Sequence, residues 1–255
     1  MTIILKFVRL SFFKGRSDVG KLYKYLSVAC ISAFFVGCCI KNIPVISPAR
    51  DIPMDPSSVL FVYGKNIVSN TEISGTAILV ESNEKESWAV SAGHVCYPEV
   101  SDSFVMWPDA WIEMSFDIYG RTQLMKMVAL DQKNDVCIFK IQTTDLPAAN
   151  LAKKMPEIGE KVYLGSFPLG VYSPGHVPFF EGFYAGILDD HASYTIPVTG
   201  GSSGGGIVNS KGEVVGIVSM AIQGFENITL VVKLENIQTL LDVAKKNPER
   251  FTIVR

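Results

Sequence analysis

The sequence predicts an all-β fold that ends in one α-helix. Short stretches rich in Val, Ile, Phe, Tyr and Thr recur from Val59 to Val232, separated by Gly, Pro, Asn and Asp turns. One later segment, Leu234–Lys246, differs because its apolar residues fall mostly on one face of a helix. The chain has 255 residues, 48% of them hydrophobic, which is enough for one substantial core or for two small barrels that share a cleft. The strand pattern fits a sandwich or a barrel.

The expected strands set the limits of one domain. They are Val59–Tyr63, Gly75–Glu81, Trp88–Ser91, Gln123–Ala129, Val136–Ile141, Lys161–Gly165, Gly182–Ile187, Gly206–Val208, Val214–Met220 and Ile228–Val232. No internal repeat of fixed period is visible. Because these lengths suit a unit of about 200 residues, we expect the folded domain to cover residues 59–255, with the C-terminal helix docked on it.

Residues 1–41 have the features of a targeting or anchor segment. Several basic residues precede an apolar run, Leu26–Ile40. This run is about as long as the apolar core of a signal peptide and shorter than the roughly 20 residues that a membrane-spanning helix needs. We therefore expect export to the cell envelope or periplasm, with secretion as the alternative, and contact with the membrane through this segment.

The end of the apolar run suggests a modification. Phe35–Cys38 resembles the lipobox of bacterial lipoproteins, although Phe35 stands where Leu is usual, so Cys38 is the candidate lipidation site. A later start codon, an uncleaved anchor helix and an ordinary buried helix remain alternatives. Residues 42–58 contain four prolines and no sustained periodicity, which predicts an extended linker.

Charge and cysteine content exclude several classes. The net charge is −2 and no basic run is interleaved with aromatic residues, so a nucleic-acid partner is not expected. Only Cys96 and Cys137 lie in the predicted domain, too few for a disulfide framework and without the CxxC spacing of a metal or redox site. The two cysteines could form a single bridge, but small buried free thiols are the more common state, and we expect free thiols here. No cofactor or metal ion is expected, and nothing in the sequence fixes the oligomeric state.

Three short motifs contain the parts that a serine nucleophile needs, namely a base, an acid that orients the base, and backbone donors for an oxyanion. His94 follows an expected strand and sits among small residues. Asp135 stands directly before another expected strand. Ser203 lies in the small-residue run Thr199–Gly206, where glycines permit positive φ and bring N–H groups close to a bound carbonyl.

Each motif also has a structural explanation when it stands alone. A histidine at a strand end and an aspartate at a strand start are common structural residues. A Gly/Ser run is typical of a flexible linker, but linkers are rarely bracketed so closely by apolar strands. A phosphate loop is disfavoured because it needs Gly-Lys-Ser/Thr opening a helix, whereas Ile207 and Val208 indicate a strand. The order His, Asp, Ser in one all-β chain favours catalysis.

The three motifs together resemble those of trypsin-like serine proteases. Ser91–His94 is similar to their Thr/Ser-Ala-Ala-His, Asp135–Ile138 to their Asp-Ile-Ala-Leu, and Gly201–Gly206 to their Gly-Asp-Ser-Gly-Gly-Pro. The resemblance extends over roughly residues 59–246. It implies two antiparallel six-stranded β-barrels packed across a catalytic cleft, with the histidine and the aspartate in the first barrel and the serine in the second.

Three further stretches resemble particular branches of that family. Gly165–Gly170 and Glu181–Gly182 are similar to segments of the short bacterial HtrA-type proteases, and Thr199–Gly201 is similar to the glutamyl endopeptidases. The departures from the family pattern remove no reactive group. They are Gly93, Ser202, Cys137 and Gly206. The usual disulfide partner of Cys96 would fall near Gly75, where the chain has no cysteine.

The resemblance implies a role for each site residue. Ser203 would be the nucleophile, His94 the general base and Asp135 the residue that orients the imidazole, while the backbone N–H groups of Gly201 and Ser203 would form the oxyanion hole. The substrate is then a protein or peptide. The expected substrate pocket carries no charge and so predicts a small or aliphatic P1 residue. Its walls are Pro197, Thr199, Gly200, Ser219, Met220 and Ala221. The competing hypothesis is a protease-like module of the cell envelope that holds peptides without cutting them, or a latent form.

Overall fold

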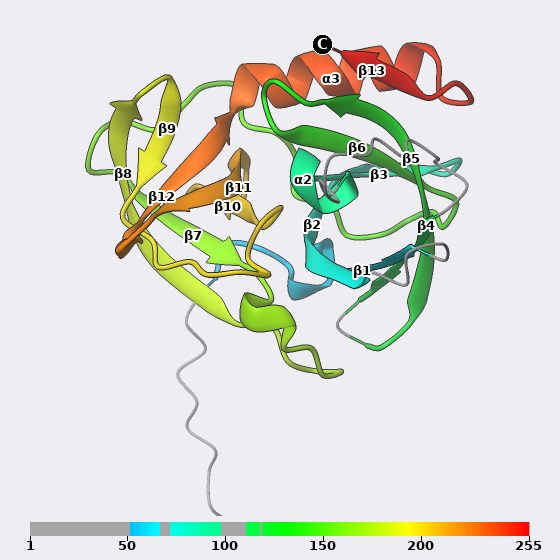
Figure 1. Ribbon diagram of the computed structural model, residues 1–255, viewed down its shortest axis with the longest axis horizontal. Coiled ribbons are helices and arrows are strands. Elements are labelled where there is room, and N and C mark those ends of the chain that lie inside the picture. Colours follow the sequence, from blue (N-terminus) through cyan, green and yellow to red (C-terminus); the bar gives the residue numbers. More distant parts are fainter. Residues whose placement is uncertain (1–51, 67–71, 98–110, 118, 255) are drawn as a thin grey trace, which may run out of the picture. The chain divides into compact units, whose positions relative to one another are not determined.

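The computed structural model describes residues 52–66, 72–97, 111–117 and 119–254 (Figure 1). The expected targeting segment, with Cys38, and the first part of the expected linker lie outside these residues. The end of that linker is structured, because Asp55 caps a 3-10 turn, η2 (Pro56–Ser58), and Met54 is buried. In the described part of the chain, no helix has the length and hydropathy that crossing a membrane requires.

The first half of the domain is one seven-stranded sheet. Its strand order is β13-β5-β4-β1-β2-β3-β6, and β5 and β6 pair in addition. All its pairs are antiparallel except that of β13 with β5, which is parallel. The strands are β1 (Val59–Asn66), β2 (Glu72–Ser82), β3 (Ser87–Ala92), β4 (Trp111–Phe116), β5 (Thr122–Asp131), β6 (Val136–Ile141) and β13 (Thr252–Val254).

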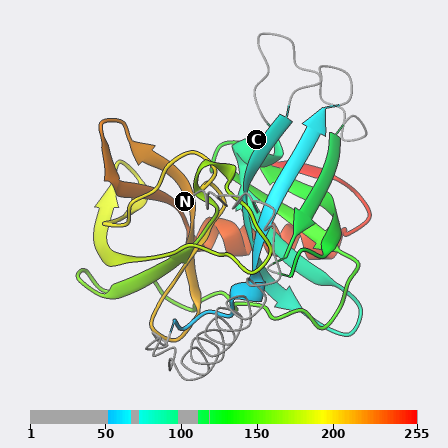
Figure 2. The same cartoon turned by 90° about the horizontal axis from the view of Figure 1, so that it is seen from below.

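The second half is a closed barrel with strand order β10-β11-β12-β9-β8-β7. Alternation along β8 places every second residue inside, so that Gly182 and Tyr184 are buried while Phe183 is half exposed. In the view of Figure 2 the barrel and the seven-stranded sheet lie side by side. The strands are β7 (Lys161–Gly165), β8 (Phe179–Leu188), β9 (His191–Tyr194), β10 (Gly206–Val208), β11 (Val214–Ile222) and β12 (Phe225–Lys233).

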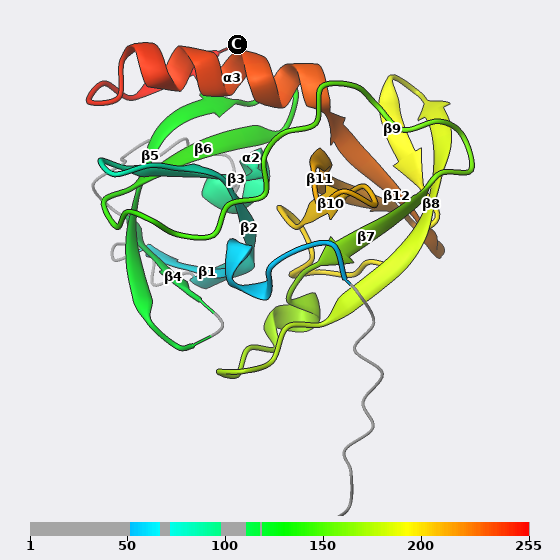
Figure 3. The same cartoon turned by 180° about the vertical axis from the view of Figure 1, so that it is seen from behind.

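Helix α3 (Leu234–Lys246) follows the barrel and has the bounds that the sequence predicts. It buries its apolar face against strands of both halves, namely β5 and β6 of the sheet and β11 and β12 of the barrel (Figures 1 and 3). The buried residues recur at the spacing of one helix face. They are Leu234, Ile237, Leu240, Leu241 and Ala244.

The fold confirms the all-β prediction with a C-terminal helix, and it differs from the expected elements in several places. Strands β6, β7 and β10 have the predicted bounds, and most others are longer by one to a few residues. Strands β4, β9 and β13 were not expected, nor was α2 (Gly93–Cys96), a four-residue helix that contains His94. Helix α2 and strands β9 and β13 have only three or four residues each, too few to show a repeat in a sequence. Strand β4 is as long as β6, so its length does not explain why it was not expected.

An aromatic cluster packs the segment after β7 against the first sheet. Phe167 meets the ring of Phe61 of β1 edge-on at 5.5 Å, and Tyr172 stacks on Phe61 at 5.1 Å. Phe167 is fully buried. This packing fixes the turn η4 (Pro168–Gly170) between the two halves of the domain, beside the loop that carries Ser203.

Candidate active site

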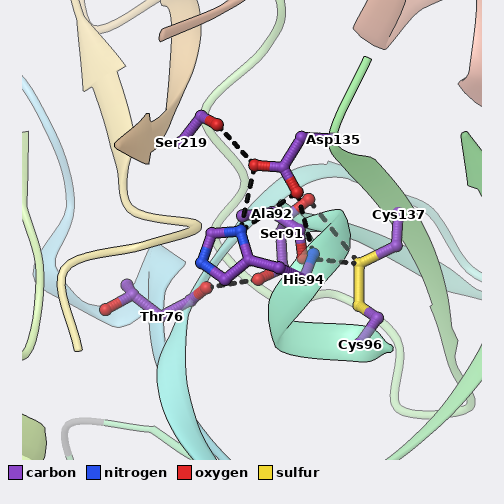
Figure 4. A network of polar contacts seen from close by, with 8 residues as sticks. All are labelled: Thr76, Ser91, Ala92, His94, Cys96, Asp135, Cys137 and Ser219. Atoms are coloured by element: carbon purple, nitrogen blue, oxygen red, sulfur yellow. Dashed lines mark hydrogen bonds and ion pairs between the residues drawn. A yellow bond between two sulfur atoms is a disulfide. The ribbon is translucent and has the colours of Figure 1, made fainter. Parts of the chain in front are cut away.

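His94 and Asp135 meet because they flank two paired strands. In the β3–β6 ladder Ala92 is paired with Val136, so the residues just after β3 and just before β6 lie at the same end of the sheet. Nδ1 of His94 is 3.0 Å from both carboxylate oxygens of Asp135 (Figure 4). The backbone N–H of His94 also donates to Oδ1 of Asp135 at 2.8 Å. The carboxylate therefore holds the imidazole by Nδ1 and leaves Nε2 for proton transfer.

The backbone at Asp135 has an uncommon conformation. Its φ is 52°, in the left-handed region where Asp and Asn are the side chains found most often after glycine. Gly93 lies against it, since a Cβ at Gly93 would be 3.0 Å from the carbonyl carbon of Asp135. The glycine that departs from the family alanine thus allows α2 to approach the backbone of the acid.

Ser219 of β11 lies on the other side of the carboxylate, and its hydroxyl donates to Oδ2 of Asp135 (Figure 4). Burial raises the pKa of the Asp135 carboxyl, but the hydrogen bonds from His94 and Ser219 together outweigh it and lower the pKa below its usual value. Asp135 is therefore a carboxylate at neutral pH. We expected Ser219 only as a pocket wall. The sequence signal for this contact was a serine within the apolar strand Val214–Ile222, because a hydroxyl buried there needs a hydrogen-bond partner.

The loop that carries Ser203 is held from both halves of the domain. The backbone N–H of Thr76, in β2, donates to the carbonyl of Ser203 at 2.9 Å, and the N–H of Gly204 donates to the carbonyl of Val218, in β11, at 2.8 Å. Gly204 has φ +85°, and a Cβ there would lie 1.9 Å from the carbonyl oxygen of Thr76. Only glycine fits this close approach.

The two adjacent serines differ in accessibility. Ser202 is fully buried, and its Oγ lies 3.4 Å from Oγ of Ser166. Ser203 is partly exposed. This difference agrees with the choice of Ser203 as the candidate nucleophile.

The backbone around Gly201 leaves two N–H donors for a ligand. The carbonyl of Gly200 accepts from the N–H of Leu169 at 2.6 Å, and the carbonyl of Gly201 accepts from Oγ1 of Thr76 at 2.8 Å. A trans peptide directs its carbonyl and its N–H to opposite sides, so the N–H of Gly201 points away from Leu169. Among the residues that the structure describes, the N–H groups of Gly201 and Ser203 have no acceptor.

The histidine and serine segments approach each other at Gly75. A Cβ there would lie 2.7 and 2.8 Å from the methyl groups of Val95 and 3.3 Å from the carbonyl oxygen of Ser203. Within the described contacts, no hydrogen bond joins the side chains of His94 and Ser203. The structure thus brings His94 and Asp135 into direct contact and Ser203 into their neighbourhood.

The expected pocket residues occupy two neighbouring stretches. Pro197, Thr199 and Gly200 are exposed between β9 and β10, whereas Ser219, Met220 and Ala221 belong to β11. One residue of β12, Thr229, contacts both stretches. Thr229 of β12 pairs with Ala221, and its Oγ1 donates to the carbonyl of Ile196 at 2.5 Å. Among the described residues, no cluster of side chains that could hold a metal ion is present.

The prediction of free thiols at Cys96 and Cys137 is wrong, because a disulfide joins them (Figure 4). Cys137 lies in β6 and Cys96 in α2, which directly follows β3. The β3–β6 pairing brings their Cα atoms to 6.5 Å, within reach of a disulfide. Since the two cysteines are 41 residues apart in sequence, their spacing did not reveal the bond.

Comparison with known proteins agrees with this geometry. The profile of the trypsin-like peptidase domain matches residues 75–217. A probable periplasmic serine endoprotease, DegP-like, of Hahella chejuensis is 28% identical over 123 residues, which are 43% of this chain and 25% of that protein. The chain therefore spans about a quarter of the length of this curated relative.

Solved structures agree on the fold. The serine endoprotease from Yersinia pestis matches with a TM-score of 0.59 at 18% identity, over 76% of this chain and 64% of the chain of that structure. The HtrA-type protease AlgW, solved with a tripeptide, has a TM-score of 0.61 at 15% identity and covers 76% of this chain and 62% of its own. At such identities the likeness concerns the fold alone.

Proposed function

The chain belongs to the trypsin-like peptidase domain family, and from this premise we propose that it is a serine endopeptidase whose triad is His94, Asp135 and Ser203. The observation that carries the proposal is the contact between His94 and Asp135, in which Nδ1 of the imidazole lies 3.0 Å from both carboxylate oxygens. The Ser203 loop, with its two available N–H donors, supports it.

The proposed mechanism gives each of these groups a defined role. Oγ of Ser203 attacks the scissile carbonyl while Nε2 of His94 takes its proton and later gives it to the leaving amine. Asp135 keeps the proton of the imidazole on Nδ1 and stabilises the imidazolium. The N–H groups of Gly201 and Ser203 bind the oxyanion. Water then hydrolyses the acyl-enzyme by the same route.

We also propose the two-barrel architecture that the family resemblance implies. The pairing of β5 with β6, in addition to the order of the seven-stranded sheet, supports closure of its six antiparallel strands into a first barrel. His94 and Asp135 would then come from the first barrel and Ser203 from the second. A substrate would lie across the boundary between them.

A small or aliphatic P1 residue is the proposed specificity. The walls from residues 196–200 and 219–221 carry no charged side chain, and Met220 is about half exposed. We expect peptides with Ala or Val at P1 to have a higher kcat/KM than matched peptides with Arg, Lys or Glu. A series of peptides that differ only at P1 measures this, and faster cleavage after a charged residue would contradict the assignment.

Export to the envelope or periplasm is the proposed location, with the membrane reached through residues 1–41. The Hahella chejuensis relative is named as periplasmic, and the apolar run after the basic residues supports the same compartment. The Cys96–Cys137 disulfide supports it independently, because disulfides persist in oxidising compartments. Lipidation at Cys38 is proposed on the sequence of residues 35–38 alone.

Labelling with a fluorophosphonate tests the triad. We expect covalent labelling of the full chain, loss of labelling in Ser203→Ala, and retention in Ser202→Ala, the matched exchange of the neighbouring serine. Mass mapping of the labelled peptide identifies the modified residue. A well-folded wild-type protein that takes no label would support a peptide-binding or latent module instead.

A further inference from the structure

The Cys96–Cys137 disulfide lies close to His94 and Asp135, the proposed base and acid of the triad. Cys96 is two residues after His94 and belongs to the same four-residue helix, α2. Cys137 is two residues after Asp135, in β6, the strand that follows the aspartate. Figure 4 shows the bond between the helix and β6, on the side of α2 away from the imidazole. The disulfide therefore ties the element that carries the base to the element that carries the acid.

Helix α2 cannot set the position of His94 by its own helical structure. Four residues form one turn, and a single turn has little stability in isolation. The residue before it, Ala92, makes no side-chain capping bond. The described links from α2 to the Asp135 segment are polar at one end and covalent at the other. The polar links are the bond from the His94 N–H to Oδ1 of Asp135 and the contacts of His94 Nδ1 with both carboxylate oxygens. The covalent link is the disulfide.

The sulfur atoms are shielded from solvent. Cys137 is fully buried and Cys96 is 4% exposed, and both belong to an apolar cluster formed by β1, β2, β3, β5 and β6. A buried disulfide is not open to attack by thiolates while the domain is folded, because exchange needs direct access to a sulfur. The bond must therefore form during folding in an oxidising compartment, and it then stays with the folded protein.

We propose that the Cys96–Cys137 disulfide is a positioning link that keeps His94 in register with Asp135, so that full hydrolytic activity requires the oxidised protein. The proposal rests on the proposed function. Reduction after partial unfolding adds two electrons and two protons to the S–S bond and gives two thiols, while a dithiol reductant is oxidised to its own disulfide. The reduced domain loses the covalent end of the connection and keeps only the polar one.

The first experiment determines the redox state. The protein is isolated from an oxidising compartment, denatured, and alkylated with and without prior treatment by a dithiol. We expect the peptides that contain Cys96 and Cys137 to be alkylated only after reduction. Alkylation of both without reduction would overturn the proposal.

The second experiment compares kinetics of the full chain and of Cys96→Ala/Cys137→Ala. We expect kcat to fall about tenfold with KM nearly unchanged, because the base is misaligned while the substrate contacts remain. Val62→Ala, in the same cluster but distant in sequence from both residues, controls for packing loss. Equal kcat values in the two variants would overturn the proposal.

A third measurement does not depend on hydrolysis. The hydrogen-bonded Nδ1 proton of His94 should give a downfield proton resonance in the oxidised protein, assigned by its absence in His94→Ala, and this resonance should broaden or vanish in the double-alanine variant. Persistence of an unchanged resonance would overturn the positioning role. Failure of wild-type protein to hydrolyse peptides or take a fluorophosphonate, with the resonance still sensitive to the disulfide, would instead refute the proposed function and support the link.

Discussion

Asp135→Asn is expected to lower kcat by about 10⁴-fold with little change in KM, the loss typical of this exchange in a serine-protease triad. Asn fits the left-handed backbone at this position, so the fold should be retained. One oxygen of Asp135 already accepts the N–H of His94, which leaves the amide NH₂ of the variant facing Nδ1. Nδ1 must then accept, the ring proton moves to Nε2, and the histidine cannot take the proton of Ser203.

The matched control for that exchange is Asp145→Asn. Asp145 is also left-handed, with φ 55°, and it is exposed after β6, outside the site. Steady-state kinetics of both variants on one peptide, with circular dichroism to verify folding, measure the effect. A kcat for Asp135→Asn within tenfold of wild type would contradict the assigned role of the carboxylate.

Gly204→Ala is expected to destabilise the domain by about 4 kcal/mol. The new methyl group would lie 1.9 Å from the carbonyl oxygen of Thr76 and 2.2 Å from Oγ of Ser91, and the residue has φ +85°. The loop must therefore move away from the first sheet, which breaks the bond from Thr76 N–H to Ser203. Urea unfolding measures the loss in free energy of unfolding.

Gly200→Ala is the matched control in the same loop. No atom lies within 4 Å of the position that its Cβ would take, and its φ is not in the left-handed region. Its free energy of unfolding should stay within about 0.5 kcal/mol of wild type, as for exchanges outside packed or strained positions. Equal stabilities of the two variants would contradict this prediction, because they would show that the loop accommodates a methyl group at Gly204 without loss of stability.

The sequence predicted those features that depend on the identity of side chains near one another in the chain. The apolar spacing of Leu234–Lys246 gave the helix its bounds, and small residues around His94 and Ser203 marked the turns that carry them. The order of the motifs and the family resemblance were enough to predict that His94 and Asp135 act together. In the structure they meet because each flanks one of two paired strands of the same sheet.

Features that depend on long-range geometry or on backbone atoms were not predicted. The disulfide joins residues 41 positions apart, and nothing in that spacing distinguishes it from two free thiols. The hydrogen bond from the Leu169 N–H to the carbonyl of Gly200 joins two backbone groups, so no pattern of side chains in the sequence predicts it. Strand β13 has three residues and a parallel partner far away in sequence, and neither leaves a periodic signal.

Helix α3 has a thermodynamic consequence. Its apolar face packs on β5 and β6 as well as on β11 and β12, and the chain continues from it into β13 of the first sheet. Neither half of the domain can unfold without exposing part of that face. We therefore expect the two halves to unfold as one cooperative unit, so that the residues from the sheet and the serine from the barrel lose their order in a single transition.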